Sequence, residues 1–164
     1  MPTVVFICTA NRYRSPLAAA MFQKCLQADG NVVEWKVASA GVWTIIGQPA
    51  LLSVVRLAEK MGMTLHSHLS RPVDADLLSQ ADLIIAMEAG QREALLAEFP
   101  QVEGRVFLLS EVAVGITYDI PDLLDDKGNP TLELGNEVCS LVELGYKNIC
   151  QLALRLSVES PSGR

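Results

Sequence analysis

The chain has 164 residues and a mass of 17.8 kDa; half of its residues are hydrophobic and 20% are charged. This composition excludes a mainly disordered chain and suits one α/β or α+β domain with a sizeable core. The formal net charge of −6, from 13 basic and 19 acidic residues, argues against a general nucleic-acid surface, because such surfaces neutralise phosphates with basic side chains.

Membrane insertion and export are not expected. The longest apolar runs, such as residues 83–87 and 112–114, are too short to cross a bilayer. The N-terminal apolar stretch is also short and lacks a basic flank, so we interpret it as a core strand rather than a signal peptide. We expect one domain over residues 1–159 and a flexible tail over residues 160–164.

The chain contains four cysteines, namely Cys8, Cys25, Cys139 and Cys150. They show neither CxxC pairing nor a metal-like spacing with histidine, so no metal site is expected. Because no export signal is present, we expect reduced thiols and a cytoplasmic location. At least three of the four are expected to be core residues, since free cysteine behaves as a small hydrophobe.

Hydrophobic periodicity predicts strands and helices in alternation. In chain order we expect a strand over residues 3–8, a helix over 16–27, a strand over 32–38, a helix over 50–61, a short helix over 76–80, a strand over 82–87, a helix over 88–99, a strand over 105–109, a loop over 118–130 and a long helix over 131–158. The continuous apolar character of the first strand is typical of a central parallel strand.

Individual residues predict several helix boundaries. Ser15 followed by Pro16 fits an N-cap with proline at the first helical position. Gly62 and Pro100 are expected to end the helices over 50–61 and 88–99. The long last helix is open to an interruption near Gly145.

The alternation of elements predicts a parallel sheet with helices on both faces. In such folds, ligands bind at the carboxyl ends of the strands, near the point where the strand order reverses. The loop after the first strand is therefore the place to expect a functional site, and that loop begins at Cys8.

This loop reads Cys8-Thr9-Ala10-Asn11-Arg12-Tyr13-Arg14-Ser15-Pro16. A Cys, five residues, an Arg and then a Ser or Thr is expected by chance about 0.02 times in a chain of this composition. A short loop entering a helix can direct successive N–H groups inward and form an anion nest. Arg14 would add a bidentate fork for phosphate oxygens, and the same positive field would favour the nucleophilic thiolate of Cys8. Ser15 would hydrogen-bond the sulfur and ease its departure as a leaving group.

The loop resembles the signature of the low-molecular-weight protein tyrosine phosphatase family, Cys-x-Gly-Asn-x-Cys-Arg-Ser-Pro. Four further segments resemble stretches of that family, namely Ser39-Ala40-Gly41, His68-Leu69-Ser70-Arg71, Ala81-Asp82-Leu83-Ile84-Ile85-Ala86-Met87 and Asp119-Ile120-Pro121-Asp122. The resemblance covers most of the chain. It implies a flavodoxin-like, three-layer domain with a four-stranded parallel sheet, of the phosphotyrosine protein phosphatase I type, and it implies that no metal or cofactor is needed.

The resemblance also implies roles for particular residues. Cys8 would be the nucleophile and Arg14 the phosphate clamp, while Asp122 would protonate the leaving oxygen and then activate the water that hydrolyses the phosphocysteine. The phosphate would be bound by the loop residues Thr9, Ala10, Asn11, Arg12, Tyr13, Arg14 and Ser15. The loop would be supported by Asn11, Ser15, Ser39 and His68, with Asn11 in a left-handed conformation. The substrate would be a phosphotyrosine-containing protein or a small aryl phosphate, with inorganic phosphate as product.

Several positions depart from the family pattern. Ala10 replaces the usual glycine, which demands an ordinary φ there, and we expect the loop to tolerate it. Tyr13 replaces a cysteine that can form a protective disulfide with the nucleophile, so Cys8 is expected to oxidise without that local rescue. Leu123 replaces the proline after the general acid, and its loss would slacken the position of the acid.

Arg12, Trp43 and Leu124 are the candidate walls of the substrate pocket. A positive charge at Arg12 would favour acidic peptides or substrates with a further phosphate and would oppose phosphoarginine; the alternative is a side chain turned into solvent. The aromatic residues that usually follow the acid are absent, with Leu124 in their place. Trp43 is the candidate aromatic wall; the alternatives are core packing of Trp43 and contact through Tyr118.

Other interpretations stay open at this point. Asp119 and Asp125 are second choices for the general acid. A non-catalytic phospho-binding protein is an alternative function, although a pure binder needs no nucleophile. A thiol-dependent arsenate reductase is a further alternative, which the absence of cysteines between Cys25 and Cys139 weakens. The sequence does not indicate the oligomeric state or the physiological substrate.

Overall fold

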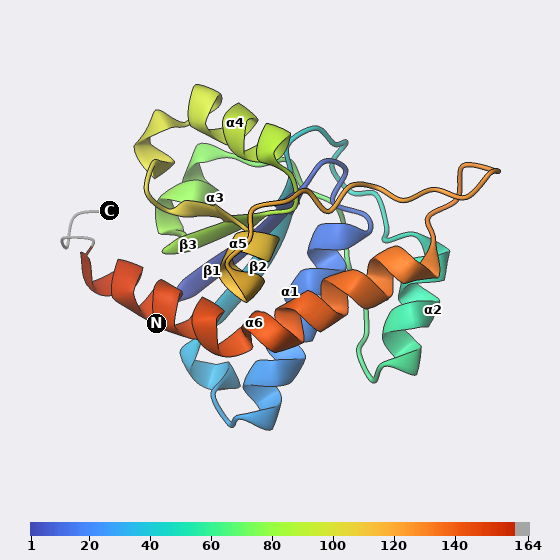
Figure 1. Ribbon diagram of the computed structural model, residues 1–164, viewed down its shortest axis with the longest axis horizontal. Helices are drawn as coiled ribbons and strands as arrows, with labels where there is room; N and C mark the ends of the chain where they lie inside the picture. The colour runs from blue at the N-terminus through green and yellow to red at the C-terminus, as the bar shows by residue number, and fades with distance from the viewer. Residues whose placement is uncertain (160–164) are drawn as a thin grey trace.

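Four parallel strands form the middle layer of the protein. The computed structural model describes residues 1–159 and contains β1 (Thr3–Cys8), β2 (Lys36–Gly41), β3 (Leu83–Ala86) and β4 (Val106–Leu108). The strand order is β2-β1-β3-β4, so the order reverses beside β1 (Figure 1). This arrangement confirms the predicted parallel sheet, and it places the carboxyl end of β1 at the switch point where α/β folds bind ligands.

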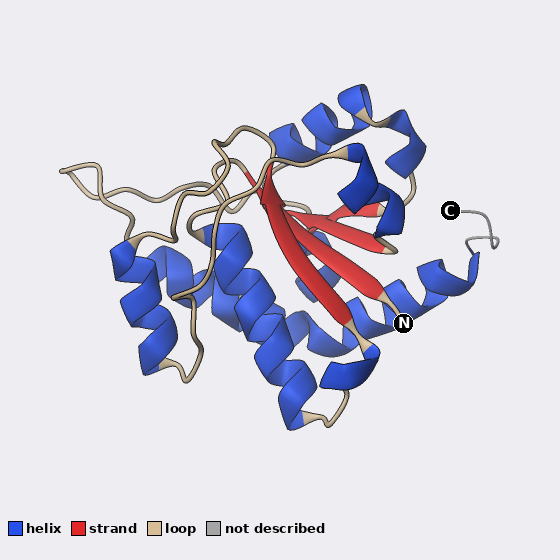
Figure 2. Cartoon of the chain, turned by 180° about the vertical axis from the view of Figure 1, so that it is seen from behind, coloured by secondary structure: helices blue, strands red, loops and turns tan. Residues whose placement is uncertain are grey.

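Helices cover both faces of the sheet, and Figure 2 shows them as two outer layers. One face carries α1 (Arg14–Ala28) and α6 (Leu132–Glu159), with α2 (Leu52–Lys60) and α5 (Leu109–Val114) packed beside them; the other carries α3 (Ala75–Gln80) and α4 (Ala89–Glu98). Two 3₁₀ turns complete the list, η1 (Val32–Glu34) and η2 (Pro100–Val102). Successive β1 side chains alternate between the two cores, and Phe6 and Cys8 face the α1/α6 side.

The prediction of a strand over residues 32–38 was wrong at both ends. Val32–Glu34 forms a 3₁₀ turn in which Val33 is 80% exposed, and β2 runs instead over Lys36–Gly41. Pairing with β1 begins only at Lys36, whose partner is Thr3, so apolar character at 32–33 does not mark a buried strand. The Ser39-Ala40-Gly41 segment therefore ends β2 rather than following it.

The predicted cap of the first helix was also wrong. The helix α1 begins at Arg14, and Tyr13 occupies the cap position without a side-chain cap bond. The hydroxyl of Ser15 bonds Cys8 and Asn11 instead, so it is unavailable as a cap. Pro16 still lies in the first turn, where its missing N–H costs no helical hydrogen bond.

The last helix runs without interruption through Gly145, and the structure adds a helix, α5, that was not predicted. A Cβ at Gly145 would lie 2.8 Å from Cα of Ala113 in α5. The glycine thus permits close contact between the two helices rather than a break in α6.

The remaining elements lie within a few residues of their predicted bounds, a normal disagreement at element ends. Gly62 follows α2 with a φ of 76°, in agreement with its predicted role at the end of that helix. Residues 118–130 form the predicted loop. The predicted tail over residues 160–164 lies outside the described residues.

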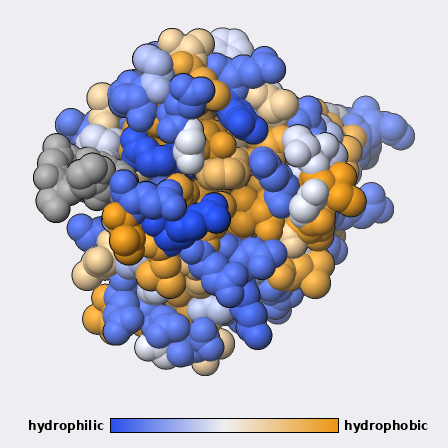
Figure 3. Space-filling model, turned by 60° about the vertical axis from the view of Figure 1, so that its left-hand side comes forward, coloured by the Kyte–Doolittle hydropathy of each residue, from blue (hydrophilic) through white to orange (hydrophobic). Residues whose placement is uncertain are grey.

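The surface mixes hydrophilic and hydrophobic side chains, as the face in Figure 3 shows. Within residues 1–159, every helix is too short or too polar to span a bilayer.

Replacing Gly145 by alanine tests the close contact between α5 and α6. Gly145→Ala is expected to lower the free energy of unfolding by about 1–3 kcal/mol, because the new methyl group meets the backbone of Ala113. The matched control is Gly90→Ala in α4, where a Cβ meets nothing within 4 Å and alanine should stabilise the helix by about 0.5–1 kcal/mol. Urea denaturation measures both changes, and equal effects at the two positions would contradict the packing role of Gly145.

Candidate active site

The phosphate loop, residues 8–15, connects the carboxyl end of β1 to the first turn of α1. The buried Sγ of Cys8 lies 2.9 Å from Oγ of Ser15 and accepts a hydrogen bond from the backbone N–H of Asn11 at 3.3 Å. Two polar groups of the loop therefore converge on this sulfur. A sulfur at the entry of a helix, beside hydrogen-bond donors, suits a nucleophilic cysteine.

Asn11 holds the loop in its curved shape. Its φ of 56° makes it the one non-glycine residue with a positive φ within residues 1–159, which agrees with the expected left-handed conformation. Its Nδ2 donates to Oγ of Ser15 at 2.8 Å and to Oγ of Ser39 at 2.9 Å, and its Oδ1 accepts from the backbone N–H of Arg71 at 3.0 Å. Nε2 of His68 lies 2.7 Å from the carbonyl oxygen of Asn11. The structure thus brings the four predicted supporting residues together.

The carbonyl groups of the loop are bound from outside. Those of Cys8, Thr9 and Ala10 accept hydrogen bonds of 3.0, 3.1 and 2.6 Å from successive residues of the segment 42–44. Gly41 makes this approach possible, because a Cβ there would lie 2.4 Å from the carbonyl oxygen of Thr9. Carbonyls turned outward leave the N–H groups of the loop facing the interior, as in an anion nest.

Arg14 is buried and surrounded by acceptors. It forms an ion pair and hydrogen bond with Glu88, and its Nη1 also donates to the carbonyl oxygen of Ile120 at 2.7 Å. Asp122 Oδ1 lies 3.0 Å from Nε, but the direction of the N–H does not make a hydrogen bond. Nε is consequently a buried donor without a hydrogen-bond acceptor, a costly condition that an anion at this place would relieve.

Glu88 is a site residue that no sequence motif indicated. It occupies the cap position of α4 and forms a capping box with Gln91. The side chain of Gln91 also donates to Oγ1 of Thr9 at 3.2 Å, which connects α4 to the phosphate loop. The available signal was the position of Glu88 at the carboxyl end of β3, directly beside β1.

Three aspartates of the acid loop, residues 118–131, occupy different positions. Asp122 lines the same pocket as Cys8. Asp119 accepts a hydrogen bond of 2.8 Å from the N–H of Ala89. Asp125 accepts two backbone N–H bonds within its own turn, and the bond from Asn129 lowers the pKa of its carboxyl group. Of these three carboxylates, the structure brings only that of Asp122 into the pocket.

The pocket over Cys8 has a volume of about 350 Å³. It is lined by Cys8, Ala10, Arg12, Tyr13, Arg14, Leu51, Asp122, Leu124, Gly128, Asn129 and Pro130. Arg12 and Leu124 therefore lie where the sequence analysis placed them. Trp43 does not line the pocket; its side chain is 84% exposed beside the phosphate loop. Leu51 and residues 128–130 form further walls that no sequence motif had indicated.

Tyr13 connects the phosphate loop to the far end of the acid loop. Its hydroxyl donates a hydrogen bond of 2.6 Å to the carbonyl oxygen of Thr131, and burial raises the pKa of the phenol. Gly135 leaves room for this hydroxyl, since a Cβ there would lie 2.9 Å from it. Thr131 in turn donates its N–H to the carbonyl oxygen of Leu123 at 2.9 Å, so this tyrosine anchors the segment that follows Asp122.

The other three cysteines lie in helices, Cys25 in α1 and Cys139 and Cys150 in α6. Burial raises the pKa of Cys25 and Cys150, and it raises the pKa of Cys139 to about 12. A thiol with a raised pKa carries little thiolate at neutral pH and reacts slowly. All four thiols are free.

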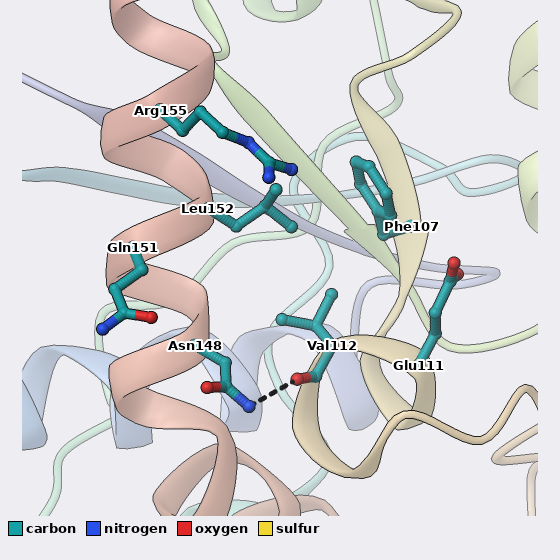
Figure 4. A pocket seen from close by; sticks show the side chains of 7 residues that line it. All are labelled: Phe107, Glu111, Val112, Asn148, Gln151, Leu152 and Arg155. Carbon is teal, nitrogen blue, oxygen red and sulfur yellow. Dashed lines mark hydrogen bonds between the residues drawn. The ribbon is translucent and has the colours of Figure 1, made fainter.

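A second pocket, of about 410 Å³, lies between α6 and the β4–α5 segment. Figure 4 shows Arg155 and Leu152 on α6 opposite Phe107, with Glu111 on the far side. Its lining contains no cysteine, serine or histidine. Within residues 1–159, no group of three or more His, Cys, Asp or Glu side chains is arranged to hold a metal ion.

Comparisons with known proteins agree on one family. The sequence profile described as "Low molecular weight phosphotyrosine protein phosphatase" matches residues 3–157. The protein-arginine-phosphatase of Bacillus subtilis is 31% identical over 119 residues, which cover 73% of this chain and 77% of that protein. The probable low molecular weight protein-tyrosine-phosphatase EpsP of Ralstonia nicotianae is 31% identical over 120 residues, with the same two coverages of 73% and 77%. A solved structure of the YwlE arginine phosphatase, a mutant with a phosphorylated active-site serine, is 28% identical with a TM-score of 0.75 and covers 94% of this chain and 95% of its own.

Two substitutions at Asn11 distinguish the contribution of its backbone conformation from that of its side-chain hydrogen bonds. Asn11→Gly keeps access to the positive φ but loses the amide hydrogen bonds, whereas Asn11→Ala loses both. We expect both variants to bind orthovanadate more weakly than the wild type, and we expect Asn11→Ala to be less stable than Asn11→Gly by about 1–2 kcal/mol. Calorimetric titration and urea denaturation measure the two effects. Wild-type vanadate affinity in Asn11→Gly would show that the amide network does not shape the loop.

The Tyr13 hydroxyl is tested by Tyr13→Phe. Loss of its hydrogen bond to Thr131 is expected to lower the free energy of unfolding by about 1 kcal/mol and to speed amide hydrogen exchange in residues 123–131. Tyr118→Phe is the matched control, because the Tyr118 hydroxyl forms no hydrogen bond within residues 1–159. If Tyr13→Phe and Tyr118→Phe exchange alike in this segment, Tyr13 does not anchor it.

Proposed function

Because the chain belongs to the low molecular weight phosphotyrosine protein phosphatase family, we propose that it hydrolyses phosphotyrosine or another aryl phosphomonoester through a phosphocysteine intermediate. The protein is a phosphatase of this class, whose named relatives include both protein-tyrosine- and protein-arginine-phosphatases. The proposed substrate and mechanism rest on one observation: Cys8, Arg14 and Asp122 line the same pocket.

Cys8 is the proposed nucleophile and attacks phosphorus. Its sulfur already accepts a hydrogen bond from the Asn11 N–H and lies within hydrogen-bond distance of the Ser15 hydroxyl. The unfilled Nε donor of Arg14 would bind one phosphoryl oxygen, and the inward N–H groups of residues 9–15 would bind the others. The phosphorylated active-site serine in the YwlE mutant supports a phosphoryl transfer to the residue at this place.

Asp122 is the proposed general acid. In its protonated form it would give its proton to the phenolic oxygen as the P–O bond breaks, so that a neutral phenol leaves and the phosphoryl group stays on Cys8. The resulting carboxylate would then take a proton from water as the water oxygen attacks phosphorus. The P–S bond breaks in that step, releases inorganic phosphate and restores the Cys8 thiolate, which the Ser15 hydroxyl stabilises.

The backbone bonds held by Asp119 and Asp125 support the choice of Asp122 over these two carboxylates. Each of the two is occupied by backbone N–H groups outside the pocket lining. The acid loop places Asp122 within ion-pair distance of Arg14 instead. A phosphoryl group that binds Arg14 would compete for this contact and leave Asp122 free to meet the leaving oxygen.

An aryl phosphate fits the pocket better than phosphoarginine does. Arg12 on the wall would repel the cationic guanidinium of a phosphoarginine side chain, whereas Leu124 offers an apolar wall to a phenyl ring. The chain is as similar to a protein-arginine-phosphatase as to a probable protein-tyrosine-phosphatase, at 31% identity each. Phosphoarginine is therefore the second candidate substrate. Trp43, exposed beside the loop, is proposed to contact the part of a protein substrate that lies outside the pocket.

The nucleophile and the acid are tested together with two substrates, phenyl phosphate and p-nitrophenyl phosphate, in the presence of EDTA. Cys8→Ser is expected to abolish turnover of both. Asp122→Asn is expected to lower kcat for phenyl phosphate by about 100-fold or more, since its poor leaving group needs the proton, and to lower kcat for p-nitrophenyl phosphate much less. Stopped assays of phosphate release measure both rates.

Asp119→Asn is the matched control, since asparagine keeps an oxygen that can accept from Ala89. Its rates should stay near those of the wild type for both substrates. A leaving-group effect in Asp119→Asn rather than in Asp122→Asn would transfer the acid role to Asp119. A wild-type protein that binds orthovanadate but turns over neither aryl phosphate nor phosphoarginine would overturn the enzymatic proposal in favour of phosphate binding.

A further inference from the structure

We propose that Arg12 forms a second anion-binding position at the rim of the Cys8 pocket, one that selects phosphotyrosine substrates carrying a carboxylate on a neighbouring residue. This inference rests on the proposed phosphatase function and adds a substrate class to it. It depends on how Arg12 is held, on the charges around it, and on which other group already binds the phosphoryl oxygens.

Arg12 is held at both its backbone and its side chain. Its carbonyl oxygen accepts a hydrogen bond of 3.1 Å from the N–H of Leu51, and its Nε donates to the carbonyl oxygen of Pro49 at 2.8 Å. These two bonds fix the residue against the segment that precedes α2. The side chain is half-buried and lines the pocket together with Cys8 and Asp122. A positioned guanidinium loses less conformational entropy on binding an anion than a mobile one does.

Arg12 is also the uncompensated charge of the pocket. The charged side chains in the lining are Arg12, Arg14 and Asp122, and Arg14 already pairs with Asp122 and with Glu88. Within residues 1–159, Arg12 forms no ion pair, and the terminal nitrogens of its guanidinium carry no hydrogen bond to the protein. Four N–H donors on those nitrogens are thus available to a ligand.

The phosphoryl group itself does not account for these donors. Arg14 shares the pocket with Cys8 and has an unfilled Nε donor, and the N–H of Asn11 already points to the Cys8 sulfur. Arg12 lines the same pocket, but its Nε is bound to the carbonyl oxygen of Pro49 rather than left open to the phosphoryl group. The group that suits it is a second anion a few ångströms from the phosphate. A carboxylate can accept two parallel N–H bonds from a guanidinium, and Asp or Glu next to phosphotyrosine supplies one.

The protein as a whole is acidic, so a preference for an acidic peptide must come from a local contact such as that with Arg12. With a net charge of −6, the protein repels an acidic peptide at long range. Salt screens that repulsion beyond about 10 Å at 0.1 M, whereas a direct pair with Arg12 survives. A rim ion pair of this kind should change kcat/KM by about threefold to tenfold, in line with exposed to partly buried pairs.

The test uses two phosphotyrosine peptides that are identical except for glutamate or glutamine on both sides of the phosphotyrosine. The measured quantity is the ratio of kcat/KM for the glutamate peptide to that for the glutamine peptide. The wild-type ratio is expected to be about three to ten at about 0.1 M salt, where the long-range repulsion of the glutamate peptide is screened and the direct pair with Arg12 remains. Arg12→Gln should bring the ratio to one or below, and Arg12→Lys should keep part of it.

Arg56→Gln is the matched control, because it removes one positive charge from an exposed position of α2, outside the pocket. Its ratio should equal that of the wild type. A wild-type ratio near one, or an equal fall in Arg12→Gln and Arg56→Gln, would overturn the role of Arg12. If Arg12→Gln loses the structure of the loop, Arg12→Lys decides the question: a ratio above one supports the role of Arg12, and a ratio of one contradicts it.

Hydrolysis of p-nitrophenyl phosphate separates this inference from the function on which it rests. That substrate carries no carboxylate, so its turnover reports the phosphatase reaction alone. Turnover that Cys8→Ser abolishes, together with a peptide ratio of one, would reject the Arg12 position and retain the phosphatase. Absence of turnover in the wild type would reject the proposed function itself.

Discussion

Asn11 holds the phosphate loop closed around the Cys8 thiol, because its backbone turns at a φ of 56° while its amide bonds three separate segments. An ordinary L-residue would bear a cost of about 1–2 kcal/mol in this conformation, and asparagine bears less. The buried amide would be costly to leave unbonded, so the partners and the turn support one another. The position of the sulfur therefore depends on Ser39 and Arg71, which lie far away in the sequence.

The acid loop depends on the same first turn of α1. It contains no helix or regular strand, and it lacks the proline that usually follows the acid, because Leu123 stands there. Arg14 binds the carbonyl oxygen of Ile120 on one side of Asp122, and Tyr13 binds that of Thr131 on the other. Two adjacent residues of the phosphate loop thus fix both ends of the segment that carries the acid. Tyr13, which stands where the family pattern has a cysteine, thus has a structural role in this chain.

Local pattern was sufficient for some features of the fold and the site. The continuous apolar run of β1 and the spacing from Cys8 to Arg14 are short-range signals. The strand has the predicted bounds, and the loop after it brings Ser15 to the Cys8 sulfur as expected. The features that were missed depend on contacts between distant segments. Val33 is apolar yet exposed, since pairing of β2 begins only at Lys36. Gly145 suggested a helix break. The structure shows instead that α5 packs so closely against this position that a side chain would not fit, and periodicity did not reveal α5.

Glu88 and Asp122 both neutralise the positive charge of Arg14, and the difference between the two pairs suits the proposed reaction. A buried guanidinium requires a carboxylate partner, because an unpaired charge in the interior is strongly destabilising. Glu88 is hydrogen-bonded to Arg14 and fixed by its capping box, with 30% of its side chain exposed. The Asp122 side chain is 51% exposed and approaches Nε without a hydrogen bond. Moving Asp122 away from Arg14 therefore costs less interaction energy than moving Glu88 would. A phosphoryl dianion at Nε would therefore displace Asp122 and not Glu88. In the proposed reaction, Glu88 would keep Arg14 in place while Asp122 would be released toward the leaving oxygen, where a proton is needed.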